Sequence, residues 1–412
     1  MIGSLLVWRV KTFYQFFIAP PKKWKLPKKS EVVIYDASGA ELFLQYLTGY
    51  DVEIVPLRGE SVNIQCLLRA MLKRRFWTTK PLKVYAETYI EVTAPMVIIT
   101  FIDNNVNFYK LSQRFPDTKT IFIQNGMRGG GRDIFVSVTQ STKYRVDYML
   151  VFNNAFGRKY KEFIEGEYFS LGSFRSNNLE INVQSNQDTV LFISQYRPKP
   201  KNSAIFTADE AGFPVSWENF YGAEALVLSF LKQWCIKNHR FLQIAGCLSE
   251  LQGAEREFFA ANLAGLNWEY VPRMDSYGSY KLVDAAEIVV FIDSALGFES
   301  IGRGKKTVGL SCRGQLLNDS TLSFGWPAAL PDNGPFWTND PDAYQFKRVM
   351  DYVVDLSPED WERVRLAHSA DLMEFDLGNT KFKALISRLL PQSTGCTRRS
   401  EGANSHSRSV FQ

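Results

Sequence analysis

Short apolar runs alternate along the chain with segments in which apolar residues recur at helical spacing. The first series of runs occupies residues 31–37, 52–57, 94–103, 119–126 and 148–154. The second series occupies residues 189–196, 240–246, 266–271, 289–293 and 307–311. Strands that are apolar on both faces are typical of parallel sheets covered by helices on both sides. The pattern therefore predicts an α/β protein with two parallel sheets.

Segments with helical spacing of apolar residues connect the predicted strands. They lie at 39–50, 62–76, 107–116, 156–164, 222–238, 256–265, 279–286 and 295–304, and near the end of the chain at 343–354 and 358–375. A helix between successive strands is the βαβ arrangement of doubly wound sheets. We therefore expect two tandem Rossmann-like domains with a cleft between them.

Polar stretches mark the expected domain boundaries. Residues 176–188 are polar and show no regular pattern, which indicates a linker between two domains. We predict the first Rossmann-like domain at 31–180 and the second at 188–390. Residues 1–30 form a basic amphipathic segment, and residues 391–412 are polar and low in complexity, which predicts a disordered tail.

Positive charge is concentrated at the N-terminus. The chain has 48 Lys and Arg against 43 Asp and Glu. The segment from Arg9 to Lys29 contains no Asp or Glu. Trp8, Phe13, Phe16 and Phe17 beside these cations suit a helix in a membrane interface, with the later lysines attracted to anionic lipid. The alternative is a helix docked on the protein's own surface and followed by a solvated basic linker. Basic residues are not interleaved with aromatic ones across a sheet, so nucleic-acid binding is not expected.

The scattered cysteines and the few histidines predict no metal and no bound cofactor. The five cysteines form no CxxC pair, and the chain contains three histidines. A structural zinc site or a disulfide framework is therefore not expected, and a reducing cytoplasm fits best. No run of 18 or more apolar residues occurs, so no membrane-spanning helix is predicted.

One strand end in the second half combines the features of an anion site. An apolar run ends in Asp293 and Ser294, and a short helix follows, so free backbone N–H groups and the positive end of a helix dipole face the end of the strand. Gly297 would let a ligand approach the backbone closely, and Glu299 could hold ribose hydroxyls. The alternative is ordinary packing, with Glu299 paired to Arg303 four residues later.

Other strand ends carry polar residues as well. Asp103 and Asn105 follow the third strand of the first domain, and Gln124 and Asn125 follow the fourth. These residue types also favour turns for local reasons, so both readings stay open for each of them. The loop 126–133, with four glycines and two arginines, is either a surface loop or a clamp for an anion in the cleft.

Three segments resemble one family of bacterial proteins. The pattern Asp-Ser-x-Leu-Gly-x-Glu-x-x-x-Arg-Gly-Lys-Lys, residues 293–306, resembles the donor-site motif of bacterial surface-carbohydrate (O-antigen) biosynthesis proteins, which are glycosyltransferases of GT-B architecture. Residues 100–128 and 325–338 fit the same group, so the likeness covers roughly residues 30–390. The core of the motif is also similar to that of capsule Kdo transferases and CDP-glycerol glycerophosphotransferases.

The resemblance implies a cytoplasmic glycosyltransferase, associated peripherally with the inner membrane, that adds a sugar to a lipid-linked O-antigen or capsule intermediate. The donor would be a nucleotide sugar bound as a substrate on the second domain, the acceptor would face the first domain, and no metal would be required. The residues expected to bind the donor nucleotide are Ser194, Gln195, Arg197, Arg273, Asp293, Ser294, Gly297, Glu299, Ser300 and Arg303.

We expect the catalytic groups on the first domain. Asp103 is the candidate carboxylate, because sugar transfer needs a base for the acceptor hydroxyl or a nucleophile. Asn105, Gln124 and Asn125 could position sugar hydroxyls. Three alternatives stay open: a CMP- or CDP-linked Kdo-like or polyol-phosphate transferase, a sugar-nucleotide epimerase, and a non-catalytic assembly protein.

Overall fold

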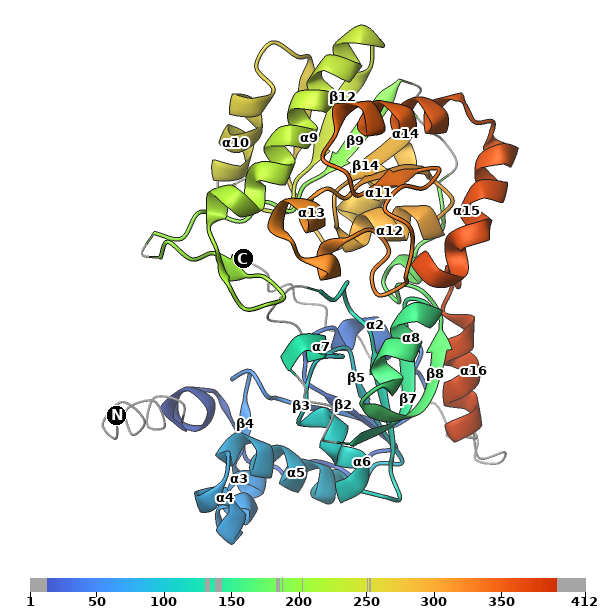
Figure 1. Ribbon diagram of the computed structural model, residues 1–412. Coiled ribbons are helices and arrows are strands. Elements are labelled where there is room, and N and C mark those ends of the chain that lie inside the picture. Colours follow the sequence, from blue (N-terminus) through green and yellow to red (C-terminus); the bar gives the residue numbers. More distant parts are fainter. Residues whose placement is uncertain are drawn as a thin grey trace, which may run out of the picture.

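The computed structural model consists of two α/β domains, which lie one above the other in Figure 1. The structure describes residues 13–129, 134–137, 143–182, 186, 188–201, 203–249, 251 and 253–390. Each domain is built on a six-stranded parallel sheet. This arrangement confirms the predicted pair of doubly wound domains.

The sheet of the first domain has the strand order β3–β2–β5–β6–β7–β8. Its strands are β2 (Val32–Tyr35), β3 (Val52–Val55), β5 (Val97–Thr100), β6 (Lys119–Ile123), β7 (Tyr144–Val151) and β8 (Ile164–Ser170). All four residues of β2 and of β5 are buried, because helices cover both faces of the sheet. The helices of this domain are α2 (Ala40–Leu44), α3 (Ile64–Met71), α4 (Arg74–Thr78), α5 (Pro81–Thr93), η2 (Phe108–Lys110), α6 (Leu111–Arg114), α7 (Ile134–Ser137) and α8 (Asn154–Lys161).

The sheet of the second domain has the order β13–β12–β9–β14–β15–β16. Its strands are β9 (Thr189–Ile193), β12 (Phe241–Ala245), β13 (Trp268–Val271), β14 (Ile288–Phe291), β15 (Lys306–Leu310) and β16 (Trp337–Thr338). Around it lie the hairpin β10 (Thr207–Ala208) and β11 (Pro214–Val215) and the helices α9 (Trp217–Lys237), α10 (Ala254–Asn262), α11 (Gly278–Ala285), α12 (Ala295–Gly302), α13 (Arg313–Leu317), η5 (Ser320–Leu322), α14 (Ala343–Asp355) and α15 (Pro358–Leu372).

Three departures from the predicted elements lie in the first domain. The helix expected at 62–76 is divided, because Lys73 is extended (φ −83°, ψ 126°) between α3 and α4. The edge strand β8 was not predicted, since exposed Glu165 and Glu167 interrupt its apolar pattern. Helix α5 was also not predicted, and it buries polar residues such as Thr88 together with apolar ones.

The last described helix, α16 (Thr380–Leu389), packs on the first domain although it follows the second in sequence. Figure 1 shows it beside β8. Phe382 lies in one apolar cluster with Phe43 and Phe174, and the Tyr50 hydroxyl donates to the Leu390 carbonyl at 2.8 Å. The range 188–390 predicted for the second domain therefore includes a helix whose core contacts are with the first sheet.

A buried asparagine fixes the start of this helix. Asn379 immediately precedes α16 and has no exposed surface. Its amide donates to the Phe174 carbonyl at 3.0 Å and to Asn178 Oδ1 at 2.7 Å, while its own oxygen accepts from Asn177 Nδ2 at 3.0 Å. Residues 176–178 form the short helix η3 at the start of the expected linker. The linker and α16 are thus joined by buried hydrogen bonds.

The described part of the N-terminal segment lies against the first domain. The short helix η1 (Tyr14–Ile18) packs Phe17 on Phe76 and Tyr85, and β1 (Lys22–Lys23) pairs in parallel with β4 (Val62–Asn63). Trp8, Arg9 and Lys11, which entered the membrane-interface prediction, lie outside the described residues. Among the helices that the structure describes, none has the length and apolar character needed to cross a bilayer.

We predict that Phe382→Ala destabilises the protein by about 3–5 kcal/mol, because it leaves a cavity where α16 meets Phe43 and Phe174. The measurement is the shift of the urea unfolding midpoint followed by tryptophan fluorescence. Ser387→Ala, on the exposed face of the same helix, is the matched control and should leave the midpoint unchanged. Equal midpoints for Phe382→Ala and the unmodified protein would contradict the role assigned to α16.

Candidate functional site

A cavity of about 300 Å³ lies between the two domains. Arg128, which follows β6, lines it from the first domain. Gln195, Asp293 and Arg313 line it from the second domain, after β9, β14 and β15 respectively. The other lining residues are Met127, Gly129, Phe220, Ala295, Phe298, Thr321, Leu322, Ser323 and Trp326. The cavity thus lies at the carboxyl ends of parallel strands from both sheets, where ligands bind in doubly wound folds.

Arg313 is the main cation on the second-domain side of the cavity. Its guanidinium bridges both oxygens of Asp293 at 2.6 and 2.7 Å, forms an ion pair with Glu224, and stacks on the Phe220 ring at 4.1 Å from the centroid. Both carboxylates raise the pKa of Arg313, and burial raises the pKa of Glu224. Arg313 was not predicted as a site residue, although it closely follows the predicted strand at 307–311, and this position was the available signal.

The start of α12 lies in the cavity wall, with Ala295 and Phe298 among the lining residues. Ser294 precedes the helix, and its side chain makes no capping hydrogen bond to the first turn. The N–H groups of that turn therefore donate no hydrogen bond to the Ser294 side chain, although the Gly297 N–H donates to the Ser294 carbonyl at 3.0 Å. The positive end of the helix lies beside the cavity. A Cβ at Gly297 would overlap the Phe291 ring, so the glycine also permits close packing of α12 on β14.

Glu299 lies between the two domains and is almost fully buried. Ser173, in the segment after β8, and Tyr280, on α11, both donate hydrogen bonds to its carboxylate. Burial is the main reason that the pKa of Glu299 is raised, while nearby Arg175 acts in the opposite direction. The carboxylate is therefore held in place by groups from both halves of the chain.

Two residues predicted on the same helix are engaged elsewhere. Ser300 donates to the Leu296 carbonyl at 2.7 Å within α12. The buried side chain of Arg303 pairs with Asp284 at 2.6 and 2.9 Å and does not form the ion pair with Glu299 that was considered from the sequence. It also donates to backbone carbonyls of the linker, namely those of Ser176, Leu179 and Glu180. Arg303 thus fastens the linker to the second domain at the far end of α12 from Ser294.

The remaining donor-site candidates lie around the ends of β9 and β13. Gln195 lines the cavity, and its amide oxygen accepts from Arg313 at 3.4 Å. Ser194 is buried, and its hydroxyl accepts from the Tyr196 N–H at 3.1 Å. Arg197 donates to the Tyr196 carbonyl at 3.1 Å, and Arg273 is exposed. Of these four, the structure brings Gln195 into the cavity wall.

The first-domain candidates surround Arg128. Asp103 is completely buried and accepts hydrogen bonds from Arg128, from the Tyr160 hydroxyl and, at 3.3 Å, from the Asn125 N–H. Asn125 Oδ1 also accepts from Arg128 at 2.7 Å. These contacts hold the Arg128 side chain in the cavity wall. The anion-clamp interpretation of the loop 126–133 stays a prediction. Residues 130–133 of that loop lie outside the described residues.

Two further polar candidates complete local turns. Gln124 is buried, accepts from the Phe152 N–H at 3.0 Å and donates to the Gly126 carbonyl at 3.0 Å. It therefore ties the end of β6 to the end of β7. Asn105 accepts from the Asn107 N–H at 3.0 Å, which is the turn geometry considered from the sequence.

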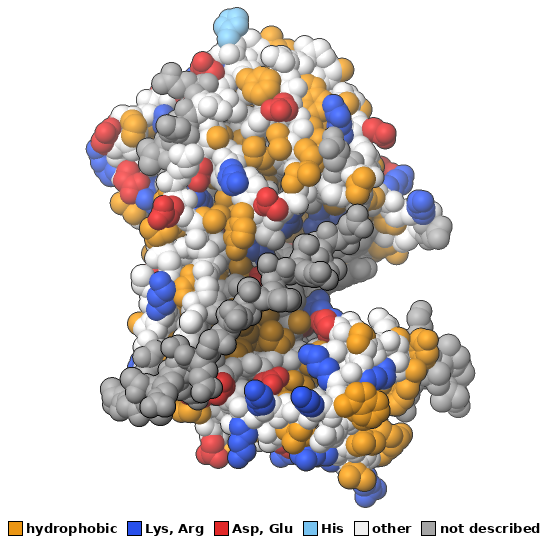
Figure 2. All heavy atoms as spheres, turned by 180° about the vertical axis from the view of Figure 1, so that it is seen from behind, with side chains coloured by type: hydrophobic (Ala, Val, Ile, Leu, Met, Phe, Trp, Pro, Cys, Tyr) orange, Lys and Arg blue, Asp and Glu red, His pale blue; other side chains and the backbone are white. Residues whose placement is uncertain are grey.

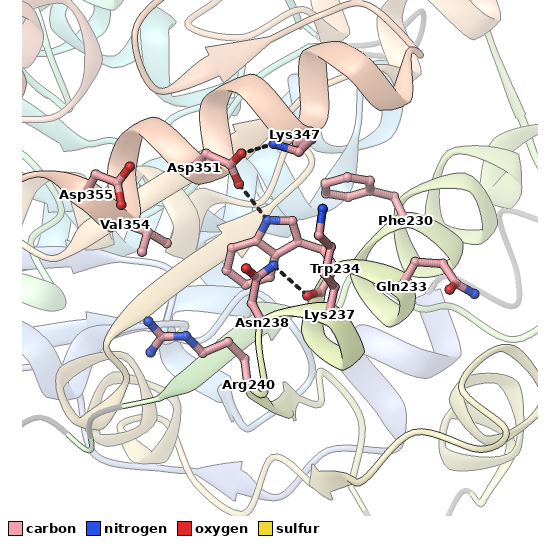
Figure 3. Close-up of a pocket in the computed structure, with 10 residues that line it drawn as sticks. All are labelled: Phe230, Gln233, Trp234, Lys237, Asn238, Arg240, Lys347, Asp351, Val354 and Asp355. Atoms are coloured by element: carbon pink, nitrogen blue, oxygen red, sulfur yellow. Dashed lines mark hydrogen bonds and ion pairs between the residues drawn. The ribbon is translucent and has the colours of Figure 1, made fainter.

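A different cavity, of about 450 Å³, lies at the amino-terminal edge of the second sheet (Figure 3). It is lined by the end of α9, by Arg240 before β12, and by the end of α14. Its polar groups bind one another: Trp234 Nε1 donates to Asp351 at 3.0 Å, and Lys347 pairs with the same carboxylate. This cavity lies at the opposite end of the strands from Asp293, so the interdomain cavity is the better candidate site.

Side chains that commonly bind metals are dispersed in the part of the chain that the structure describes. No group of three His, Cys, Asp or Glu residues lies there with the proximity that a metal ion requires. The described cysteines are free thiols, and burial raises the pKa of Cys247 to about 11 and that of Cys66 to about 12. These two thiols are therefore protonated at neutral pH and are poor nucleophiles.

Solved structures with the same two-domain fold include sugar-nucleotide enzymes. UDP-GlcNAc 2-epimerase from Neisseria meningitidis, bound to UDP-GlcNAc, has a TM-score of 0.50 and 10% identity, covering 87% of this chain and 99% of that chain. S. aureus MnaA with UDP also has a TM-score of 0.50 and 10% identity, covering 87% and 97%. A glycosyltransferase from Rickettsia africae has a TM-score of 0.48 at 13% identity, covering 88% and 99%. For the two structures with a TM-score of 0.50, the likeness at 10% identity concerns the fold alone.

The sequence of the chain identifies its protein family, which the fold does not. Among curated protein sequences, none matches this chain. The model of one protein family, described as "putative O-antigen biosynthesis protein", matches residues 121–390. This range is more than half of the chain and includes Arg128, Asp293, Glu299 and Arg313. The chain therefore belongs to this O-antigen biosynthesis protein family.

Proposed function

We propose that this protein is a glycosyltransferase that moves a sugar from a nucleotide-activated donor onto an O-antigen or capsule intermediate. One observation carries the proposal. A cavity between two Rossmann-like domains brings Arg128 of the first domain opposite Asp293, Arg313 and the uncapped start of α12 in the second. Membership of the O-antigen biosynthesis family supports the polysaccharide product.

The donor nucleotide is assigned to the second domain. Its phosphates would lie at the start of α12, where Ser294 leaves the first-turn N–H groups without a side-chain cap and the helix dipole favours negative charge. Glu299 lies outside the cavity lining and is hydrogen-bonded to Ser173 and Tyr280, so it would accept hydrogen bonds from the ribose hydroxyls in place of one of these donors. Two structures that share the fold contain uridine nucleotides, MnaA with UDP and UDP-GlcNAc 2-epimerase with UDP-GlcNAc, which makes UDP one candidate alongside CMP, CDP and GDP.

Transfer requires positive charge next to the leaving phosphate. The bond between the sugar and the phosphate oxygen breaks, a bond to the acceptor oxygen forms, the acceptor proton passes to a base, and negative charge collects on the departing nucleotide. Arg128 and the start of α12 can stabilise that charge in a partly enclosed site. We therefore propose a reaction that requires no metal.

Asp103 is assigned a positioning role for Arg128. A base must reach the acceptor hydroxyl, whereas Asp103 has no exposed surface, and its oxygens accept hydrogen bonds from Arg128, Tyr160 and the Asn125 N–H. Its carboxylate holds the guanidinium in a two-point contact that directs it toward the cavity. The residue predicted as the catalytic carboxylate thus acts through its neighbour.

We place the enzyme at the cytoplasmic face of the inner membrane, where a lipid-linked acceptor would be found. Five lysines between Lys22 and Lys29 are exposed and can interact with anionic lipid. An epimerase remains the second candidate, because the same fold occurs in UDP-GlcNAc 2-epimerase from Neisseria meningitidis. Donor turnover without any acceptor would favour the epimerase.

We predict that one of CMP, CDP, UDP and GDP binds saturably and that Glu299→Gln weakens its affinity about tenfold or more, as expected for the loss of a charged hydrogen bond. Isothermal titration calorimetry measures both. Glu359→Gln, at an exposed position of α15, is the matched control and should bind like the unmodified protein. Failure of all four nucleotides to bind, or equal affinity in both variants, would contradict the donor site.

We predict that Arg128→Lys and Asp103→Asn each lower kcat by about 100-fold and leave nucleotide affinity unchanged, because both disturb stabilisation of the leaving group. The assay follows nucleotide release from the preferred donor with a lipid extract of the source bacterium as acceptor. The double variant should be no slower than either single variant, since both changes disrupt the same Arg128–Asp103 pair. Multiplied losses would show that Asp103 acts independently of Arg128.

A further inference from the structure

Large apolar side chains project from the outer end of the first domain. Leu72 is 88% exposed, Trp24 69%, Trp77 62% and Leu68 56%. Figure 2 shows hydrophobic side chains gathered at this end of the molecule, at lower right, with Lys and Arg beside them. Such a concentration of exposed aromatic and aliphatic groups marks an interaction surface.

Specific contacts bring these residues onto one surface. Trp77 Nε1 donates to the Met71 carbonyl at 2.8 Å, which joins α4 to the end of α3. Gln65 Nε2 donates to the Trp24 carbonyl at 2.9 Å, which joins the start of α3 to the segment after β1. Trp24, Leu68, Leu72 and Trp77 are called the outer apolar surface from here on.

The break at Lys73 determines which aromatic residues face outward. The extended backbone there turns the chain between α3 and α4, so that Phe76 enters the core while Trp77 remains exposed. Phe13 and Phe17 pack on Phe76 from the N-terminal segment. Two of the aromatic residues expected to enter a membrane interface therefore complete the protein core.

Cations surround the outer apolar surface. The side chains of Lys22, Lys23, Lys25, Lys28, Lys29, Arg69, Arg74 and Lys80 are exposed, and within the described chain none of them forms an ion pair. By contrast, the acids of α5 are already paired with Lys73, Arg75 and Lys83. The surface thus combines apolar groups with a surplus of positive charge.

This combination fits a lipid bilayer better than another protein. Lysine is depleted at the centres of protein interfaces, whereas here the exposed residues Lys23 and Lys25 flank Trp24 in sequence. Tryptophan and leucine insert at the boundary between headgroups and acyl chains, and adjacent lysines and arginines are attracted to anionic headgroups.

We propose that the outer apolar surface docks on an anionic phospholipid bilayer. The inference rests on the proposed function, which places the acceptor in a membrane, and it identifies the part of the first domain that makes the contact. Because Arg128 belongs to the same domain, docking would hold one wall of the interdomain cavity at a fixed orientation to the bilayer.

The test is co-sedimentation of the full-length protein with vesicles of phosphatidylcholine alone or mixed with phosphatidylglycerol. The mixed vesicles should bind the protein at least tenfold more tightly, and added salt should weaken that binding. Leu72→Glu combined with Trp77→Glu should lower the affinity for mixed vesicles at least tenfold. Leu366→Glu, at an exposed leucine of α15 in the second domain, is the control and should bind normally.

Calorimetry on the same variants separates this proposal from the donor site. Leu72→Glu with Trp77→Glu should bind nucleotide normally, so loss of vesicle binding alone supports the docking surface even if no nucleotide binds. Vesicle binding unchanged in that variant would overturn the proposal and assign any membrane contact to the N-terminal segment alone. A self-association of the protein that the double change abolishes, without vesicle binding, would identify a protein interface and also overturn it.

Discussion

Burial of guanidinium groups against carboxylates determines the shape of the cleft. A charged side chain can leave water only when a partner of opposite sign and further hydrogen bonds replace its hydration. Arg128 meets Asp103 at the end of β6, and Arg313 meets Asp293 across the ends of β15 and β14. Removing one partner would leave an uncompensated charge, so each pair fixes the position of its loop. The walls of the cavity are therefore set by electrostatic pairing as well as by the sheets beneath them.

The buried arginines differ in whether their guanidinium groups reach the cavity. The guanidinium of Arg303 donates to Asp284 and to backbone carbonyls of the linker. Arg303 therefore joins the linker to the second domain. Arg128 and Arg313 also contact the cavity, where a ligand could compete for part of their hydrogen bonds. Arginines thus occupy either a purely structural position, as Arg303 does, or a position in the cavity wall, as Arg128 and Arg313 do.

The fold was predictable because its signal is local. A buried parallel strand such as β2 is continuously apolar, and its neighbours repeat the pattern at the spacing of a connecting helix. Edge strand β8 lacks that signal, since one face meets solvent. The packing of α16 on the first sheet could not be predicted, because its apolar face would fit either domain and the choice depends on residues far away in sequence.

The sequence predicted that the candidate site lies at the ends of strands, but not which side chains there line the cavity. Asp103 and Asp293 follow strands in the same way, yet one is sealed beneath Arg128 and the other lies in the cavity wall. Sequence spacing does not distinguish these environments, since burial depends on which side chain arrives from another loop. Glu299 was predicted from the sequence as a ribose-binding carboxylate, which stays a prediction. Its hydrogen-bond partners Ser173 and Tyr280 could not be predicted, because they lie on segments that carry no comparable motif.

The return of α16 to the first domain has a consequence for synthesis of the chain. Ribosomes deliver the first sheet long before Phe382, Leu385 and Ile386, which cover one of its faces. The second domain has all of its strands once residue 338 has emerged, whereas the first must wait for the last helix. Its uncovered apolar face is therefore present throughout translation of the second domain, and nascent chains would need a chaperone or a transient cover at that face.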